Sequence, residues 1–443
     1  MKLNYKQTIL IGFAFLSISS FWQMYDNLVP LILTKTFTIN ETFSGIIMAA
    51  DNVLALFLLP LFGGISDKSN FKIGKRKPFI IFGTIAAVIL MMGLPILDNS
   101  FFAKPALWKL VSFIVLLGFL LVSMGTYRSP AVALMPDVTP KPLRSKGNAI
   151  INLMGAVGGI LYLIANSILY SKSKTEGLEH INYLPVFIVV GVIMLIALFI
   201  IVFFINEPKL REKQLNYEKE HPEEEVTVTE NGNKKIPKPV KKSLIFLLLS
   251  VAFWYIGYNA ITTWFSVYAT TMWGMAPGEA SLCLTIAMAG AIVSYIPVGN
   301  LASRIGRKLT ILFGAGLLTL CFFTSFIYTV FFNHFHWSLY IIFVLVGIAW
   351  AAINVNSLPM VVEMCSGADI GKFTGFYYTF SMAAQTVTPV VAGFLLSNIS
   401  YKTLFPYATV FVAFSFVTML FVKHGDSKPQ KKASALESFD IED

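Results

Sequence analysis

Twelve long apolar runs constrain what this chain can fold into more than any other feature of its sequence. A bilayer core about 30 Å thick is crossed by roughly 20 apolar residues in a helix. Only 13% of the 443 residues are charged, whereas soluble proteins carry about a quarter. The sequence therefore predicts an all-α membrane protein with twelve transmembrane helices, over 8–33, 43–66, 78–97, 107–135, 147–170, 184–206, 243–271, 279–302, 309–332, 338–364, 373–398 and 403–423.

The positive charges predict the orientation of these helices. Cytoplasmic loops of membrane proteins retain Lys and Arg. With the N-terminus inside, 27 of the 34 Lys and Arg fall on inside segments, six fall outside, and Arg128 lies within a run. We therefore expect a multi-pass protein of the cell (plasma) membrane with both termini cytoplasmic. The net charge of +10 then reflects topology and attraction to anionic lipid, and no nucleic-acid partner is expected.

A polar segment with a similar pattern follows the second and the eighth run. Residues 63–77 begin with Gly-Gly-Ile-Ser-Asp-Lys and end with Gly-Lys-Arg-Lys, and residues 299–308 read Gly-Asn-Leu-Ala-Ser-Arg-Ile-Gly-Arg-Lys. Parallel half-repeats are typical of carriers that rock one helix bundle against the other. The predicted organisation is an N-terminal six-helix bundle over 1–206, a charged cytoplasmic linker over 207–242, a C-terminal six-helix bundle over 243–424 and a cytoplasmic tail over 425–443.

These segments resemble the signature loops of the major facilitator superfamily. The extended form over 67–79, and Tyr-Arg-Ser-Pro-Ala-Val-Ala-Leu-Met-Pro-Asp over 127–137, are similar to the sucrose and glycoside-pentoside-hexuronide cation symporters. The resemblance implies two pseudo-symmetric six-helix bundles and cation-coupled uptake of a sugar or glycoside by alternating access, such as a disaccharide of the sucrose or maltose type. Leu117, Ala55 and Leu59 stand where members of that group have carboxylates. We therefore expect protons rather than sodium as the coupling ion.

Charged residues at the loop segments form the predicted gate. Asp67 can accept hydrogen bonds from a helix N-terminus and pair with Arg76, which would lock one side of the protein in one state. The alternative for the basic residues is a role in topology alone, and for Glu363 a substrate contact is as plausible as a gate. The remaining predicted gating residues are Asp137, Arg144, Arg304, Arg307 and Glu363.

Three ionisable residues fall inside predicted spans, where a charge costs at least roughly 2.5 to 3.5 kcal/mol unless it faces a cavity or a partner. They are Asp26, Asp51 and Arg128. Asp51 lies about 12 Å into its span, at 1.5 Å per residue. Our hypothesis is that Asp51, or else Asp26, takes a proton from outside and releases it inside, while Arg128 competes for the carboxylate or binds substrate oxygens. The alternative is a permanent salt bridge between Asp51 and Arg128.

Polar and aromatic side chains at helical spacing predict where a sugar binds. Sugars require directed hydrogen bonds to their hydroxyls and an aromatic surface for their apolar face. Aromatic residues make up 14% of the chain, so the alternative for any one of them is a place in the core or at the membrane interface. The predicted substrate-binding residues are Gln23, Asp26, Asn27, Arg128, Tyr258, Asn259, Trp264, Tyr378 and Gln385.

Other classes of function find little support in the sequence. It contains no HExxH, GxSxG or P-loop motif, so an enzyme is not expected. The three cysteines lie in apolar stretches without ligand spacing, and His334 and His336 have no third ligand, so neither a metal nor a cofactor is expected. A small-molecule substrate, the lipid bilayer and a monomeric state are expected. The alternatives are a sodium-coupled sugar carrier, a carrier of a lipid-like or drug-like solute, and a non-transporting membrane receptor.

Overall fold

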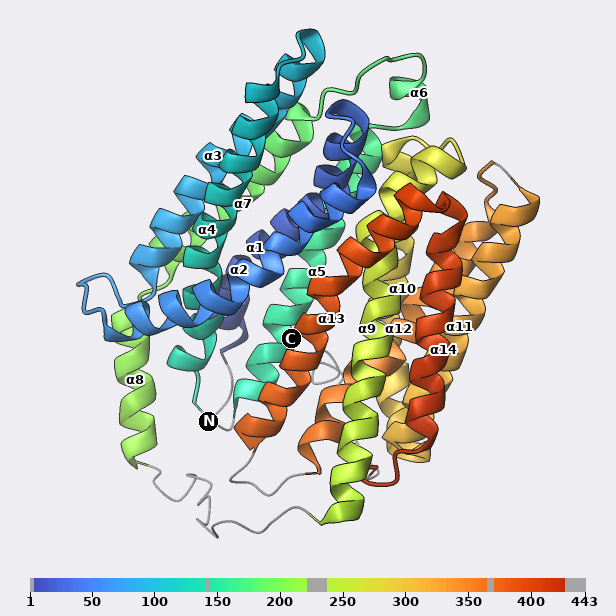
Figure 1. The fold of residues 1–443 in the computed structure, drawn as a ribbon. Coiled ribbons are helices and arrows are strands. Elements are labelled where there is room, and N and C mark those ends of the chain that lie inside the picture. Colours follow the sequence, from blue (N-terminus) through green and yellow to red (C-terminus); the bar gives the residue numbers. More distant parts are fainter. Residues whose placement is uncertain (1–3, 141–142, 221–236, 333, 365–369, 427–443) are drawn as a thin grey trace. The chain divides into compact units, whose positions relative to one another are not determined.

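A computed structural model describes residues 4–140, 143–220, 237–332, 334–364 and 370–426. Within these residues the chain is helical and has no β-strand (Figure 1). Part of the predicted linker and most of the predicted tail lie outside the described residues. The helices that carry the argument below are α1 (Tyr5–Leu31), α2 (Glu41–Lys68), α3 (Lys77–Ala103), α4 (Leu107–Val138), α5 (Arg144–Leu169), α6 (Lys172–Thr175), α7 (Leu184–Phe204), α8 (Glu207–Glu220), α9 (Lys238–Met272), α10 (Pro277–Ile305), α11 (Arg307–Phe331), α12 (Ser338–Val362), α13 (Ile370–Asn398) and α14 (Leu404–Leu420).

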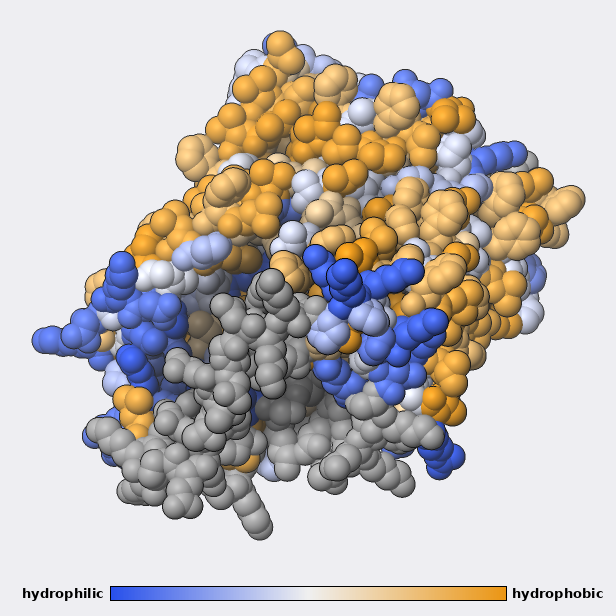
Figure 2. All heavy atoms as spheres, turned by 60° about the horizontal axis from the view of Figure 1, so that its bottom comes forward, coloured by the Kyte–Doolittle hydropathy of each residue, from blue (hydrophilic) through white to orange (hydrophobic). Residues whose placement is uncertain are grey.

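The prediction of twelve membrane-spanning helices is confirmed, because twelve of the described helices are long and apolar enough to cross a bilayer. These helices expose large apolar side chains, such as Phe57 at 70% and Val293 at 75%. Figure 2 shows hydrophobic residues over much of the visible surface. A water-facing protein would cover these side chains, whereas lipid solvates them. The predicted third span ends too early, at residue 97. Helix α3 continues past Asp98 to Ala103, because the Asp98 carboxylate is buried in the helix packing.

The contacts divide the chain into two compact units. The first unit comprises 1–40, 50–225 and 276–282, and the second comprises 41–49, 226–275 and 283–443. Within the first unit α1 packs on α5 and α7, and α3 packs on α4 and α7. Within the second unit α9 packs on α13 and α14, and α11 packs on α12 and α14. Each unit buries its own apolar core.

The predicted charged linker begins with helical residues. Its first residues form α8, and the first of them, Glu207, is only 1% exposed. The carboxylate of Glu207 accepts hydrogen bonds from the backbone N–H groups of Lys75, Arg76 and Lys77, at 2.8 to 3.2 Å. It thereby satisfies the N–H of Lys77 in the first turn of α3, which has no partner inside the helix, and the N–H groups of the two residues that precede the helix. This contact fixes the start of α8 to the loop before α3.

Candidate functional site

Three helices of the first unit bring Asp26, Asp51 and Arg128 together. Asp26 lies on α1, Asp51 on α2 and Arg128 on α4, and all three are partly buried. The Asp26 carboxylate interacts electrostatically with both Asp51 and Arg128, and Asp51 also interacts with Arg128. Asp51 further accepts hydrogen bonds from the backbone N and the side-chain Nδ2 of Asn52, at 2.6 and 2.8 Å. The three predicted coupling residues therefore form one electrostatic cluster.

An aromatic pair on α1 borders this charged cluster. The guanidinium of Arg128 lies 5.6 Å from the centre of the Trp22 ring, within the range of a cation–π contact. Among the described residues, the buried Nε1 of Trp22 and the buried hydroxyl of Tyr25 find no hydrogen-bond partner. A ligand oxygen could satisfy such donors, which otherwise cost about 1 to 3 kcal/mol each. Sequence reasoning missed Trp22, although its spacing of four residues from Asp26 places both on one helix face.

The other two predicted residues of α1, Gln23 and Asn27, are joined by a hydrogen bond within the helix. Asn27 is only 1% exposed, and its Nδ2 donates to the carbonyl oxygen of Gln23 at 2.7 Å. The side chain of Gln23 is partly buried. In this conformation, the amide of Asn27 therefore has one donor engaged within its own helix.

In the second unit, aromatic rings of α9 and α12 form a compact stack. The rings of Tyr258 and Trp350 are parallel within 6° with centroids 3.7 Å apart, and Tyr255 meets Trp350 edge to face. The hydroxyls continue onto α13: Tyr255 lies 3.3 Å from Tyr377, which lies 2.9 Å from Ser357. Sequence reasoning missed Trp350, whose position between alanines marks a large ring in an otherwise small-residue stretch.

The remaining predicted residues of the second unit differ in whether their side-chain donors already have hydrogen-bond partners. The Nδ2 of Asn259, next to the stack on α9, is buried and has no hydrogen-bond acceptor among the described residues. Trp264 is fully buried, and its Nε1 already donates to the carbonyl of Pro389 at 3.1 Å. Tyr378 and Gln385 are partly buried on α13, where Tyr378 meets Tyr377 edge to face. Asn259 is therefore the predicted residue here with a buried donor left to offer.

Arg76 organises the loop segment of the first unit. Its side chain, 4% exposed, donates from Nε to Asp137 at 2.7 Å and also contacts Asp67 and the hydroxyl of Ser66. Lys75 lies 3.1 Å from the same Asp137. The structure thus joins Asp67, Arg76 and Asp137 at the ends of α2, α3 and α4. Sequence reasoning missed Glu207, because no local signal links its carboxylate to Arg76, which lies 131 residues earlier in the chain.

The loop segment of the second unit repeats part of this arrangement. Arg307 forms an ion pair with Glu363 at the end of α12. Asp426 accepts a hydrogen bond from the backbone N–H of Lys308 at 2.8 Å, which caps α11 as Glu207 caps α3. Of the other predicted gating residues, Arg304 is exposed, and Arg144 donates to the carbonyl of Thr139 at 3.2 Å.

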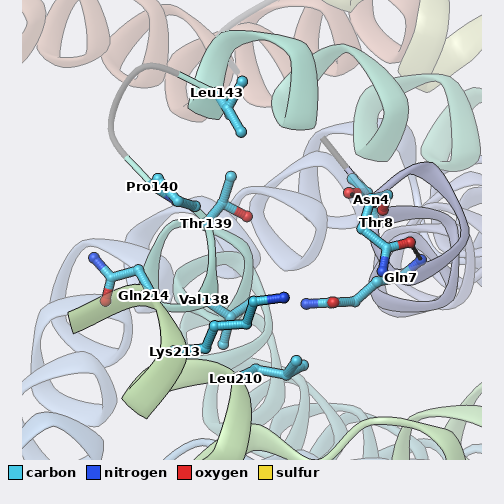
Figure 3. Close-up of a pocket in the computed structure, with 10 residues that line it drawn as sticks. All are labelled: Asn4, Gln7, Thr8, Val138, Thr139, Pro140, Leu143, Leu210, Lys213 and Gln214. Atoms are coloured by element: carbon cyan, nitrogen blue, oxygen red, sulfur yellow. Dashed lines mark hydrogen bonds between the residues drawn. The ribbon is translucent and has the colours of Figure 1, made fainter. Parts of the chain in front are cut away.

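A separate pocket lies where the start of α1, the end of α4 and α8 meet. Figure 3 shows Gln7 and Lys213 pointing toward one another across it. It encloses about 50 Å³, well below the roughly 300 Å³ at which small-molecule sites begin. None of the predicted substrate or coupling residues lines it. Within the described part of the chain, no three His, Cys, Asp or Glu side chains are placed to hold a metal ion.

Comparison with known proteins relates the whole chain to one family. The family model described as Major Facilitator Superfamily matches residues 11–273 and 247–440. An uncharacterized MFS-type transporter of Methanocaldococcus jannaschii is 22% identical over 94% of this chain and 95% of its own length. A sucrose transport protein of Arabidopsis thaliana is 31% identical over 30% of this chain, and the match spans only 24% of that protein.

Solved structures share the fold at low sequence identity. A bacterial homologue of the iron transporter ferroportin, in an inward-facing state, superposes with a TM-score of 0.68 at 12% identity, over 95% of this chain and 99% of its own. The nucleoside transporter NupG superposes with a TM-score of 0.65 at 16% identity, over 95% and 100%. At these identities the similarity establishes the architecture alone.

Proposed function

Because the chain belongs to the Major Facilitator Superfamily, and is therefore a transporter of that type, we propose that it is a proton-coupled carrier of a neutral sugar or glycoside. The observation that carries this proposal is the cluster of Asp26, Asp51 and Arg128 beside the unsatisfied donors of Trp22 and Tyr25. The match to plant sucrose transport proteins supports the substrate class.

Charge balance supports a proton as the coupling ion. Two carboxylates and one guanidinium, when all are ionised, leave one negative charge without compensation inside a span. A buried charge without a partner is costly, and one bound proton removes it. In the loaded state a single carboxylate then balances Arg128. When the site opens to the other side and the proton leaves, Arg128 is shared between two carboxylates and binds substrate oxygens less well. Proton release would thus promote substrate release.

The hydrogen-bond donors and aromatic rings of the second unit support a neutral, oxygen-rich substrate. In the second unit the span interiors contain no Asp, Glu, Lys or Arg beyond positions near helix ends, such as Glu279 and Glu363. What they offer instead is the buried Nδ2 of Asn259 and the rings of Tyr258 and Trp350. Sugar hydroxyls accept hydrogen bonds from amide and indole donors, and the apolar face of a sugar packs on aromatic rings.

The charged loop segments fit the role of gates. In this proposal Asp67, Arg76, Asp137, Arg307 and Glu363 hold the cytoplasmic ends of their helices together in one state and separate in the other. Both termini then face the cytoplasm of a cell whose plasma membrane holds the protein. The 27 Lys and Arg on segments predicted to face inward support this orientation.

Transport by purified protein in liposomes tests the proposal. A panel of labelled mono- and disaccharides is offered with an inwardly directed pH gradient, and separately with a sodium gradient. We expect at least one sugar to accumulate only with the pH gradient, and a protonophore to abolish its accumulation. Accumulation driven by sodium alone would contradict proton coupling. If no sugar moved while lipid-like solutes did, the proposed substrate class would be wrong.

A further inference from the structure

A second buried acid lies in the first unit, away from the proposed coupling cluster. Asp98, near the end of α3, has a side chain that is 0% exposed. Among the described residues, neither carboxylate oxygen of Asp98 has a hydrogen-bond partner, and the ring of His180 approaches it from the segment between α6 and α7. The Nε2 of His180 lies 3.6 Å from Asp98 Oδ2, and the His180 side chain is 14% exposed. Figure 1 shows α6 and the segment that leads to α7 at this end of the unit.

A chain of hydrogen bonds fixes which nitrogen of His180 carries a proton. The backbone N–H of Leu184 donates to Asn182 Oδ1 at 3.0 Å, so that atom is an acceptor. Asn99 Nδ2 donates to the same oxygen at 2.8 Å, which leaves Asn99 Oδ1 to face His180 Nε2 at 2.9 Å. Because an amide oxygen only accepts, Nε2 must carry the hydrogen. The proton of Nε2 therefore points toward Asn99 Oδ1 and lies close to Asp98.

The segment from residue 176 to 183 is docked on α3 through these contacts. The ring of His180 stacks on Phe102 with centroids 4.5 Å apart and planes within 12°. The hydroxyl of Tyr170 donates to the backbone oxygen of Asn182 at 3.0 Å. Among the described residues, the imidazole of His180 is the group within ion-pair distance of Asp98 that can become cationic, by taking up a proton. Loss of the His180 contacts would leave the segment held mainly through Asn182.

The two phenols near Asp98 stay neutral, and the nearby ammonium is engaged by other partners. Burial raises the pKa of Tyr170 and of Tyr183 well above its usual value, so both phenols stay neutral. The ammonium of Lys109 is committed to the carbonyls of Ser100 and Lys104 at the end of α3, at 2.7 and 2.8 Å. Burial lowers the pKa of His180, which favours its neutral form when Asp98 is also neutral. The pair of Asp98 and His180 can then gain or lose a proton as the pH changes.

We propose that Asp98 and His180 together form a proton-binding site, separate from the Asp26 and Asp51 cluster, that holds residues 176–183 on the end of α3. One bound proton neutralises the pair, either on the carboxyl or as an ion pair with the imidazolium. When that proton leaves, a fully buried carboxylate remains with no positive partner, which is costly. The segment relieves this cost by separating from α3, so that water reaches Asp98. Docking is therefore complete at low pH and is lost as the pH rises.

Spin-label mobility on the full-length protein in lipid nanodiscs tests the site without any substrate. A nitroxide is attached at E179C, an exposed position of the segment, in a variant that lacks the three native cysteines. In the otherwise unaltered chain we expect the mobile fraction to rise about twofold between roughly pH 5 and pH 9. An unchanged spectrum over this range would overturn the proposal.

Two substitutions are expected to act in opposite directions. Asp98→Asn removes the titrating charge, so the label should stay immobile at every pH. His180→Phe keeps the stacking on Phe102 but removes the imidazole that can share the proton. Docking then requires a protonated Asp98 carboxyl, so the rise in label mobility should move to lower pH. Glu176→Gln neutralises an exposed carboxylate of the same segment and should leave the transition unchanged. A transition that stays at the same pH in H180F, or a pH transition that persists in D98N, would contradict the assignment. If D98N did not fold, the opposite shift expected for H180F would still decide.

Discussion

The two units share the architecture of their loop segments and differ in what their helices bury. In both units a glycine with positive φ precedes a helix, Gly74 at +116° and Gly306 at +96°. A carboxylate then caps that helix, and an arginine pairs with an acid at the end of a third helix. In the interior the units diverge, because the first buries Asp26, Asp51 and Arg128, while the second offers neutral amides and aromatic rings. The repeated part fits a movement common to both halves, and the unrepeated part fits separate roles in ion coupling and substrate binding.

The largest expected effect comes from removing a charge of the first unit. A pH difference of one unit can drive about tenfold accumulation in a carrier that couples one proton to one substrate. In Asp51→Asn we expect this accumulation to vanish while exchange of labelled for unlabelled sugar continues, because the path stays open and only the proton site is lost. Asp26→Asn should behave in the same way. Uptake and counterflow in liposomes distinguish the two activities. Undiminished accumulation in D51N would remove Asp51 from the coupling mechanism.

A smaller effect is expected in the second unit. Asn259→Ala removes a buried donor that we assign to the substrate, and a hydrogen bond to a neutral group is worth about 0.5 to 1.5 kcal/mol. The KM for sugar should therefore rise roughly two- to tenfold, while the dependence on the pH gradient persists. Asn398→Ala is the matched control, because that amide is exposed near the end of α13. A loss of proton coupling in N259A would break the division of roles between the units.

Replacing the arginine of either loop segment should lower the thermal stability of the protein, but by different amounts. Arg76 contacts Asp67, Asp137 and Ser66, whereas Arg307 pairs with Glu363. Arg76→Gln should lower the Tm in detergent by on the order of 5 °C, after discounting the exposure of its partners. Arg307→Gln should lower it by about half as much. Equal losses, or a larger loss for R307Q, would mean that the extra partners of Arg76 contribute no stability.

The smallest expected effect concerns the two glycines. A Cβ at Gly74 would lie 2.2 Å from Glu207 Oε2, whereas a Cβ at Gly306 would lie 2.9 Å from Asp426 Oδ1. Both substitutions meet an unfavourable backbone conformation that costs about 1 to 3 kcal/mol. Only Gly74→Ala must also displace a buried carboxylate that caps α3. We expect the Tm to fall by about 2 °C more in G74A than in G306A. The reverse order would argue against Glu207 as an anchor of α8.

Much of the architecture follows from residue type and spacing. The apolar runs predict the twelve spans because a buried backbone in lipid must be helical and must be long enough to cross. The boundary at Asp98 escapes this reasoning because a carboxylate inside a helix reads as the start of a loop. For the same reason Glu207 reads as linker, although its carboxylate caps α3.

The candidate site could be predicted in part. Asp26, Asp51 and Arg128 stand out because ionisable residues are rare in spans. Trp22 and Trp350 do not stand out, because a chain with 14% aromatic residues offers many similar rings. Only the packing decides which ring lies near a guanidinium or against a tyrosine. Trp264 looks equivalent to them in sequence, yet its donor is taken by Pro389.

The sequence by itself determined the family, the number of spans, the expected orientation and the rare charges inside the helices, because each of these depends on the cost of placing one residue type in lipid. The tertiary structure decided which of those charges meet, which donors are left without acceptors, and that Asp98 and His180 share a buried contact. Such pairings depend on the packing of helices far apart in the chain, and local patterns carry no information about that packing.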